Sequence, residues 1–489
     1  MTTLSSALNY ALSGLAVSAA QSALVSRNVS FAGDENYTRK YSEIYTLPGG
    51  AAAAAPASRN MDKQLLGKLL SSTSNAAGQQ VFLDALNRLS ATAGDPEADS
   101  SMAAMLGALQ NSLKTYETNP SNSVLAASAL ESARRLVQKL NGTSAEVLSI
   151  RTEADQAMSQ SVEHINTLLS QFKVVNDSIV RGSGTAGDLA ESLDHRDSIL
   201  KMLSEEIGIR TVSRPNNDLM IYAEGGTVLF EGSPRGVSMA PTSVFPSSTM
   251  GQAVFIDGVA VTGDLSPMPI VSGRLAALAT VRDEVTLTMQ RQVDEIASGL
   301  IRSFAEQDQS AFPVLPDVAG LFVDATGGLP VPGTWSPGLA SRIGINSLAD
   351  PRQGGTPSLV RDGGFGGASY IYNQEGAAGY QTRIGQLISA FELAGNFDPA
   401  SGLGTNASLK DFGTESAAWV EARRQTAQAA ADGASATRIR ANETLLRVTG
   451  VSIDQEMAAL LDLEKSYQAS SKVISVIDSM LAALFEAVR

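Results

Sequence analysis

A single heptad frame can be followed through the chain from Ala133 to Ile179, and it restricts the possible folds more than any other feature. Apolar residues recur in it at the spacing with which one side of a helix faces a neighbouring helix. They are Ala133, Val137, Leu140, Val147, Ala154, Met158, Ile165, Leu168, Phe172, Val175 and Ile179. The frame is interrupted at Ser144, Arg151 and Ser161. It predicts a rod-like helix, with Asn141-Gly142 as the place where the rod could break, and hence a mainly α fold.

Both ends of the sequence carry another helical pattern, an apolar stripe with few charges around it. The N-terminal stripe has spacings of 4, 4 and 3 residues, at Leu4, Leu8, Leu12 and Leu15. The C-terminal stripe consists of Ile453, Met457, Leu460, Tyr467, Ile474, Ile477, Leu481 and Leu484. A lone helix cannot cover such a stripe, and each Leu or Ile withdrawn from water contributes roughly 1.5–3 kcal/mol. We therefore expect the end helices to pair as a coiled coil with each other or with a neighbouring subunit; the alternative is that both are ordinary core helices.

Changes of periodicity between the ends predict four domains. Residues 1–45 with 450–489 form a terminal helical domain, and residues 46–208 with 272–310 and 415–449 form a bundle of long helices. Residues 209–271 form a small inserted β domain, because their period switches to 2 and Asp257-Gly258 is a hairpin signal. Residues 311–414 are a Gly/Pro-rich, irregular insertion. The segment Thr46–Ser58, TLPGGAAAAAPAS, reads as a flexible connector, and the nested order places the two termini at one pole.

The charge balance argues against two classes of partner. The net charge is -14, with 50 acidic against 36 basic residues, and no basic cluster interrupts this excess. Binding to nucleic acid or to an anionic membrane surface needs a basic face, so neither partner is expected. No stretch reaches the ~18 uninterrupted apolar residues that a membrane span needs.

We find no catalytic, cofactor-binding or metal-binding constellation in the sequence. Cysteine is absent, and His164 and His195 are the only histidines. Phosphate-loop, zinc-protease, nucleophile-elbow and EF-hand motifs are missing. His195-Arg196-Asp197 matches the start of a kinase catalytic loop, but Met202 stands where an Asn is required. These residues are therefore expected to be solvated groups on an amphipathic helix, and the protein is expected not to be an enzyme.

The first charged residue is Arg27, so the N-terminal segment lacks the basic start of a cleaved secretory signal. A chain of this length without cysteine fits an extracellular bacterial protein. We expect an export route that keeps the N-terminus.

The two ends resemble the signature segments of the flagellar rod, hook and hook-associated proteins. The segment ALNYALSGLAVSAAQSALVSRNVSFAGDENYTRKYSEI has that family's A-x-x-G-L start, S-x-N turn and Y-[ST]-R-[KQ] close, although Asp34–Tyr37 lacks the usual Pro-Gly. The C-terminal segment has G-V-x-[IL]-D-x-E-M followed by Y-Q-A-S-x-K-V-I. Inside the chain, DLAESLDHRDSILKMLSEEIGIRTV and SGRLAALATVRDEVTLTMQRQVDEIASGLIRSF resemble the helical middle of the hook-associated members.

This resemblance implies a structural component of the bacterial flagellum, outside the cell at the junction of hook and filament, assembled through its terminal helices. The implied partners are copies of the chain in a ring, the hook protein, a second junction protein and through it the flagellin filament, and a flagellar export chaperone. Export would use the flagellar type III apparatus. The resemblance adds Asn28, Tyr37 and Arg39 to the stripe residues of the assembly interface. The open alternatives are another axial component, such as a hook or distal rod protein, and, less favoured, a secreted enzyme with a site in residues 311–414.

Overall fold

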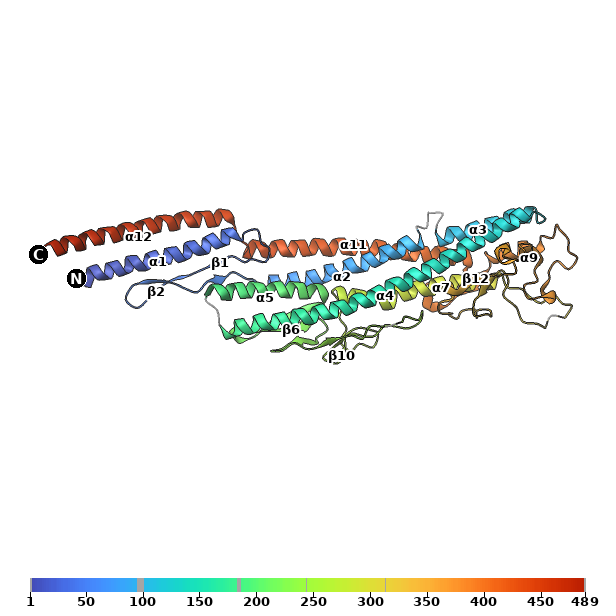
Figure 1. The fold of residues 1–489 in the computed structure, drawn as a ribbon, viewed down its shortest axis with the longest axis horizontal. Helices are drawn as coiled ribbons and strands as arrows, with labels where there is room; N and C mark the ends of the chain where they lie inside the picture. The colour runs from blue at the N-terminus through green and yellow to red at the C-terminus, as the bar shows by residue number, and fades with distance from the viewer. Residues whose placement is uncertain (1, 95–100, 183–185, 243, 313, 488–489) are drawn as a thin grey trace.

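The computed structural model describes residues 2–94, 101–182, 186–242, 244–312 and 314–487. Figure 1 shows an elongated molecule with both ends of the chain at one pole. Long helices dominate it, so the prediction of a mainly α fold is confirmed. The helices are α1 (Thr2–Ser30), α2 (Lys63–Ala93), α3 (Met102–Thr118), α4 (Ser123–Arg181), α5 (Ala186–Glu206), α6 (Arg274–Thr280), α7 (Thr286–Ser303), α8 (Leu339–Arg342), α9 (Leu359–Asp362), α10 (Thr382–Ala390), α11 (Leu409–Thr449) and α12 (Ile453–Ala487).

The strands are short and pair in small, separate antiparallel sheets. Two-stranded sheets are formed by β1 (Lys40–Tyr41) with β4 (Ser58–Arg59), β2 (Ile44–Thr46) with β3 (Ala52–Ala54), β11 (Phe322–Asp324) with β12 (Ile343–Ile345), and β13 (Ala394–Asn396) with β14 (Asn406–Ser408). Three-stranded sheets are formed by β5 (Ile209–Ser213), β6 (Leu219–Ala223) and β7 (Val228–Phe230), and by β8 (Val237–Ser238), β9 (Phe255–Ile256) and β10 (Val259–Ala260).

The heptad region forms α4, a helix of 59 residues that packs against α3, α5 and α7. The predicted seam is buried throughout, apart from the half-buried Val175. The helix is not broken at Asn141-Gly142; instead, the Asn141 side-chain amide donates to the carbonyl oxygen of Ala340 (2.6 Å) and so ties α4 to α8. The interruptions of the seam are also buried, because each makes a polar contact with another element. Ser161, for example, donates to Glu206 at the end of α5 (2.6 Å).

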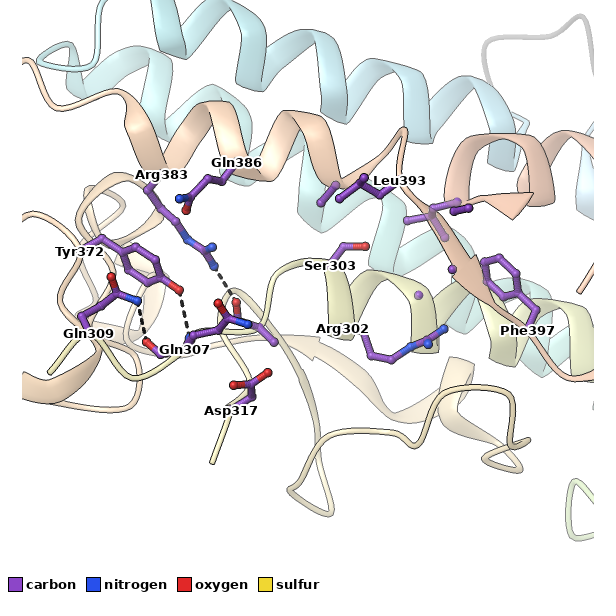
Figure 2. Close-up of a pocket in the computed structure, with 16 residues that line it drawn as sticks. Arg302, Ser303, Gln307, Gln309, Asp317, Tyr372, Arg383, Gln386, Leu393 and Phe397 are labelled. Atoms are coloured by element: carbon purple, nitrogen blue, oxygen red, sulfur yellow. Dashed lines mark hydrogen bonds between the residues drawn. The ribbon is translucent and has the colours of Figure 1, made fainter. Parts of the chain in front are cut away.

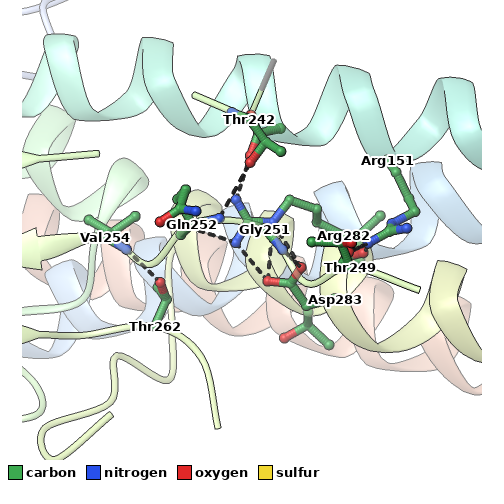
Figure 3. Close-up of polar contacts among 12 residues, drawn as sticks. Arg151, Thr242, Thr249, Gly251, Gln252, Val254, Thr262, Arg282 and Asp283 are labelled. Atoms are coloured by element: carbon green, nitrogen blue, oxygen red, sulfur yellow. Dashed lines mark hydrogen bonds and ion pairs between the residues drawn. The ribbon is translucent and has the colours of Figure 1, made fainter. Parts of the chain in front are cut away.

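The interruption at Arg151 lies beside a buried ion cluster that joins three parts of the chain (Figure 3). Between α6 and α7 the helix widens into a π-helical turn, η2 (Val281–Val285), whose Arg282 side chain is 1% exposed. Arg282 pairs with Asp155 of α4 (2.5 Å) and with Asp283 (2.7 Å), and it donates to the carbonyl oxygen of Gln252 (2.9 Å). This cluster fixes the loop before β9 onto the helical bundle.

The segment Thr46–Ser58 is not a flexible connector, so this prediction is wrong. Its alanines form β3, which pairs with β2 and packs against α1. The turn closes with hydrogen bonds from the Leu47 amide to Ala51 (2.8 Å) and from the Gly50 amide to Leu47 (3.0 Å). Gly49 and Gly50 adopt φ values of 109° and 87°, a region that suits glycine. The Pro-Gly-Gly-Ala stretch is therefore the tip of a hairpin.

The switch to period 2 at Ile209 does mark β structure, and Asp257-Gly258 is a tight turn between β9 and β10. Both turn residues have positive φ, 50° and 81°, as the predicted two-residue hairpin requires. Residues 311–414 consist of short elements, including the single 3-10 turns η3 (Pro351–Gln353), η4 (Ala368–Tyr370) and η5 (Pro399–Ser401); η1 (Pro215–Asn217) lies in the β region. Phe322 and Ile343 of this segment belong to the same buried core as the long helices.

Candidate assembly interface at the paired chain ends

Helices α1 and α12 lie against each other along most of their length (Figure 1). The buried side chains of the two helices are small or aliphatic: Ala11, Val17, Ser18 and Val25 of α1, and Ile477 of α12. The hydroxyls of Ser18 and Ser466 are 3.3 Å apart across the seam. Small residues let two helices approach closely, which explains why this seam needs few large side chains.

The structure places the stripe residues in two groups. The first group is buried or half-buried: Leu4, Leu8, Leu15, Leu460, Ile474, Ile477 and Leu481. The second group is exposed although the helices are paired: Leu12, Ile453, Met457, Tyr467 and Leu484. Pairing within one chain therefore covers only part of the predicted stripes.

A further apolar strip on α12 shares only Leu484 with the stripe predicted from the sequence. It consists of Val473, Val476, Met480 and Leu484, at spacings of 3, 4 and 4 residues, and we call it the outer strip. Val476 and Met480 are each 53% exposed. The spacing of the outer strip is visible in the sequence. The predicted stripe follows a single heptad frame, whereas α12 has apolar residues on two sides.

The motif residues Asn28, Tyr37 and Arg39 meet at the start of α12, around the carboxylate of Glu456, which is 0% exposed. Asn28 Nδ2 donates to Glu456 Oε2 (3.0 Å), and Arg39 Nε donates to Oε1 (2.5 Å). Tyr37 Oη donates to Asn28 Oδ1 (2.9 Å), and burial raises the pKa of Tyr37 to about 12. Glu456 was not among the predicted residues, although it occupies the Glu of the C-terminal signature.

The turn before Tyr37 does not need the Pro-Gly of related sequences. The Asp34 carboxylate accepts from the amide of Asn36 (2.9 Å), and the Asp34 carbonyl oxygen accepts from the amide of Tyr37 (3.1 Å). An Asx turn of this kind closes the chain locally.

A second polar cluster joins the terminal helices to the helical bundle. Asp194 of α5 accepts from the hydroxyl of Thr38 (2.6 Å) and from Arg59 (2.8 Å), and it pairs with Lys40. Arg59 also pairs with Asp197 (2.7 Å). Burial lowers the pKa of Lys40 and raises the pKa of Asp197, while the partner charges oppose both shifts. These pairs fix the hairpin segment to α5.

This cluster corrects the prediction for His195-Arg196-Asp197. His195 is exposed as expected, but Arg196 and Asp197 are buried. Arg196 donates to the side chain of Asn176 (3.1 Å) and to the carbonyl oxygen of Asn217 (2.5 Å), and burial lowers its pKa to about 10. Asp197 is a buried ion-pair partner and Arg196 is a buried hydrogen-bond donor, so neither is a solvated group.

A cavity of about 550 Å³ lies between α7, α10 and the strand β13 (Figure 2). Its arginines are already engaged: Arg383 donates to the carbonyl oxygen of Ala305 (2.7 Å), and Arg302 donates to that of Asn396 (3.2 Å). Across the residues that the structure describes, no group of three or more His, Cys, Asp or Glu side chains could hold a metal ion. None of the described helices has the length and apolarity of a membrane span.

The paired end helices, the exposed apolar strips and the elongated body define a structural protein built for assembly. Residues 71–320 match the family described as "Flagellar hook-associated protein FlgK helical domain", and residues 445–486 match "Flagellar basal body rod FlgEFG protein C-terminal". The chain belongs to the flagellar hook-associated FlgK family. The resemblance predicted from the two ends and the interior is thereby confirmed, as is a structural role at the hook–filament junction of the flagellum.

Known proteins resemble this chain in sequence and in structure. The "Flagellar hook-associated protein 1" of Bacillus subtilis (strain 168) is 22% identical over 514 residues, covering 95% of this chain and 95% of that protein. The structure of "the flagellar hook junction protein FlgK from Burkholderia pseudomallei" is 20% identical, with a TM-score of 0.44, and the match covers 53% of this chain and 47% of that one.

Proposed function

We propose that this chain is a non-enzymatic subunit that assembles, through α1 and α12, into a ring of copies at the hook–filament junction. The observation that carries this proposal is the outer strip, because Val476 and Met480 stay half exposed although α12 is already paired with α1. An apolar surface left open by the fold of a single chain is typical of an interface between subunits. Unequal end helices supply the heterologous contacts that a ring needs.

The proposed partners are the hook protein on one side of the ring and, on the other, a second junction protein that leads to the flagellin filament. We also propose type III export with a flagellar chaperone and a location outside the cell. Membership of the family supports a place in the flagellum, and the C-terminal match at residues 445–486 to the basal body rod family supports assembly with other flagellar proteins.

The four-domain division also remains a proposal. The packing supports a separate terminal domain, because the main buried core of the described residues runs from Leu66 to Leu445 and takes no residue from α1 or α12. The ion pairs of Lys40 and Arg59 with Asp194 would then set the angle between this domain and the bundle. The bundle and the β domain would face outward from the axis.

Electron microscopy of a strain that lacks this gene tests the proposed function. The expected result is hooks without filaments, with flagellin released into the medium, and recovery of filaments when the wild-type gene is restored. Normal filaments on the deletion strain would contradict a role in joining hook to filament.

A further inference from the structure

The terminal helices and the β2–β3 hairpin form three layers, with α1 in the middle. Figure 1 shows α12 on one side of α1 and the hairpin on the other. Both contacts involve α1 directly: Ser18 faces Ser466 of α12 (3.3 Å), while Ser13 accepts a hydrogen bond from the amide of Ala52 in β3 (3.1 Å). The hairpin is therefore packed as part of the terminal domain, and it forms a second outer surface of that domain.

This second surface contains an apolar groove. A cavity of about 520 Å³ lies between α1 and the chain that follows β3, and we call it the hairpin groove. Its lining consists of Ala20, Ala23, Leu24, Arg27, Lys40, Ser42, Ala54, Ala55, Pro56 and Ala57. Most of these side chains are short and apolar, so a helix could approach the backbone closely. The neighbouring hairpin residues Ile44 and Tyr45 are exposed as well, at 56% and 49%.

The outer strip on α12 is an apolar ridge that could occupy such a groove. Val473, Val476, Met480 and Leu484 follow each other at helical spacing, so they form one ridge of aliphatic side chains. The ridge and the groove are both mainly apolar, and they lie on different layers of the same domain. Because the two surfaces lie on different layers, head-to-tail contact between successive copies can use both, with the ridge of one copy against the groove of the next.

We infer that the hairpin groove of one copy receives the outer strip of α12 from a neighbouring copy. This inference rests on the proposed assembly function and names the surfaces that perform it. The occupant is a second copy of this chain, because the same domain carries both the ridge and the groove and because the predicted ring requires one contact that repeats around the axis. The hairpin then acts as the lateral docking element of the subunit.

The absence of cysteine from the chain allows a direct test. Cells without the wild-type gene express two variants together, Leu24→Cys in the groove and Met480→Cys in the outer strip. Flagella are purified, treated with a mild oxidant, and analysed by non-reducing electrophoresis and peptide mass spectrometry. Each chain carries one cysteine, so every disulfide must join two copies. Val124→Cys with Met480→Cys is the control, because Val124 is exposed but lies at the start of α4.

The expected result is a disulfide between positions 24 and 480, at least ten-fold above the control pair. Incorporation of both variants into flagella without this disulfide, or with links only between two copies of position 480, overturns the docking inference and leaves the proposed function standing. Absence of the wild-type chain itself from purified flagella contradicts the proposed function and the inference together.

Discussion

Asn28 and Glu456 are 428 residues apart in the sequence, yet the side-chain amide of Asn28 donates to the Glu456 carboxylate at 3.0 Å. Arg39 donates to the other carboxylate oxygen at 2.5 Å. These bonds join the end of α1 and the turn after it to the first residues of α12. The two signature segments of the family thus form one polar cluster, which fixes how the terminal helices leave the bundle.

Replacing Glu456 should loosen the terminal helices without unfolding the bundle. Glu456→Ala removes the acceptor that Asn28 and Arg39 share. It leaves a buried N–H of the Asn28 side chain without this partner, which should destabilise the terminal domain by about 1–3 kcal/mol. We expect faster hydrogen exchange in α1 and α12 and unchanged exchange in α4. Glu464→Ala is the matched control, since Glu464 is exposed on the same helix. Equal protection of α1 and α12 in the Glu456 variant would show that the cluster does not hold the helices.

A second prediction concerns the contribution of the π-helical turn η2 to the stability of the helical bundle. Arg282→Ala would leave Asp155 and Asp283 without their buried partner, and losses of about 3–5 kcal/mol are typical of such changes. Urea denaturation should show this loss. The exposed pair of Arg352 with Glu131 serves as the control, because Arg352→Ala should cost less than about 1 kcal/mol. Similar losses in the two variants would contradict the role assigned to the buried cluster.

The stability of the protein should depend on Glu295 between pH 4.5 and 7. Burial raises the pKa of Glu295 from 4.5 to about 7, so the folded state favours the neutral acid. The contribution of Glu295 to stability is complete below its pKa of 4.5 in the unfolded chain, and it is lost as the pH rises through its folded-state pKa of about 7. Glu295→Gln stays neutral, so its stability relative to the wild type should fall by about 1–3 kcal/mol when the pH is lowered from 8 to 4.

Thermal unfolding across this pH range measures the effect of Glu295→Gln. Glu284→Gln, at an exposed position near the start of α7, should follow the wild-type curve. A constant difference between the Glu295 variant and the wild type at every pH would mean that the pKa of Glu295 is the same in the folded and the unfolded chain.

Replacing Gly50 with a residue that has a side chain should weaken the packing of the β2–β3 hairpin against α1. Gly50 has a φ of 87°, and an added Cβ would lie 2.9 Å from the ring of Tyr10. Gly50→Ala should therefore increase hydrogen exchange at the amides of Leu47 and Ala52. Gly33→Ala is the control, because a Cβ there meets no atom within 4 Å. Unchanged protection at Leu47 would argue that the hairpin does not depend on this contact.

The long helix and the β turn could be predicted because local pattern decides them. The apolar seam of α4 fits a single period, and Asp257-Gly258 has the backbone preferences that its turn needs. Other features depend on residues distant in sequence. Asp197 is buried against Arg59, and nothing near Asp197 in the sequence indicates this partner.

The hairpin at Thr46–Ser58 could not be predicted for a similar reason. Alanine has low strand propensity, so a run of alanines after Pro-Gly-Gly reads as a connector. In the folded chain, β3 is held by its ladder with β2 and by Ser13 of α1. The outer strip of α12 was visible in the sequence, but which side of α12 faces α1 depends on the register of the two helices.

The central claim is that α1 and α12 pair within each chain and that the outer strip of α12 contacts a neighbouring subunit. A cryo-electron microscopy reconstruction of the hook–filament junction tests it most directly. We expect continuous density from Asn28 to Glu456 of one chain, with Val476 and Met480 packed against the next subunit of the ring. An outer strip that faces solvent or an open channel in the assembled junction would contradict it.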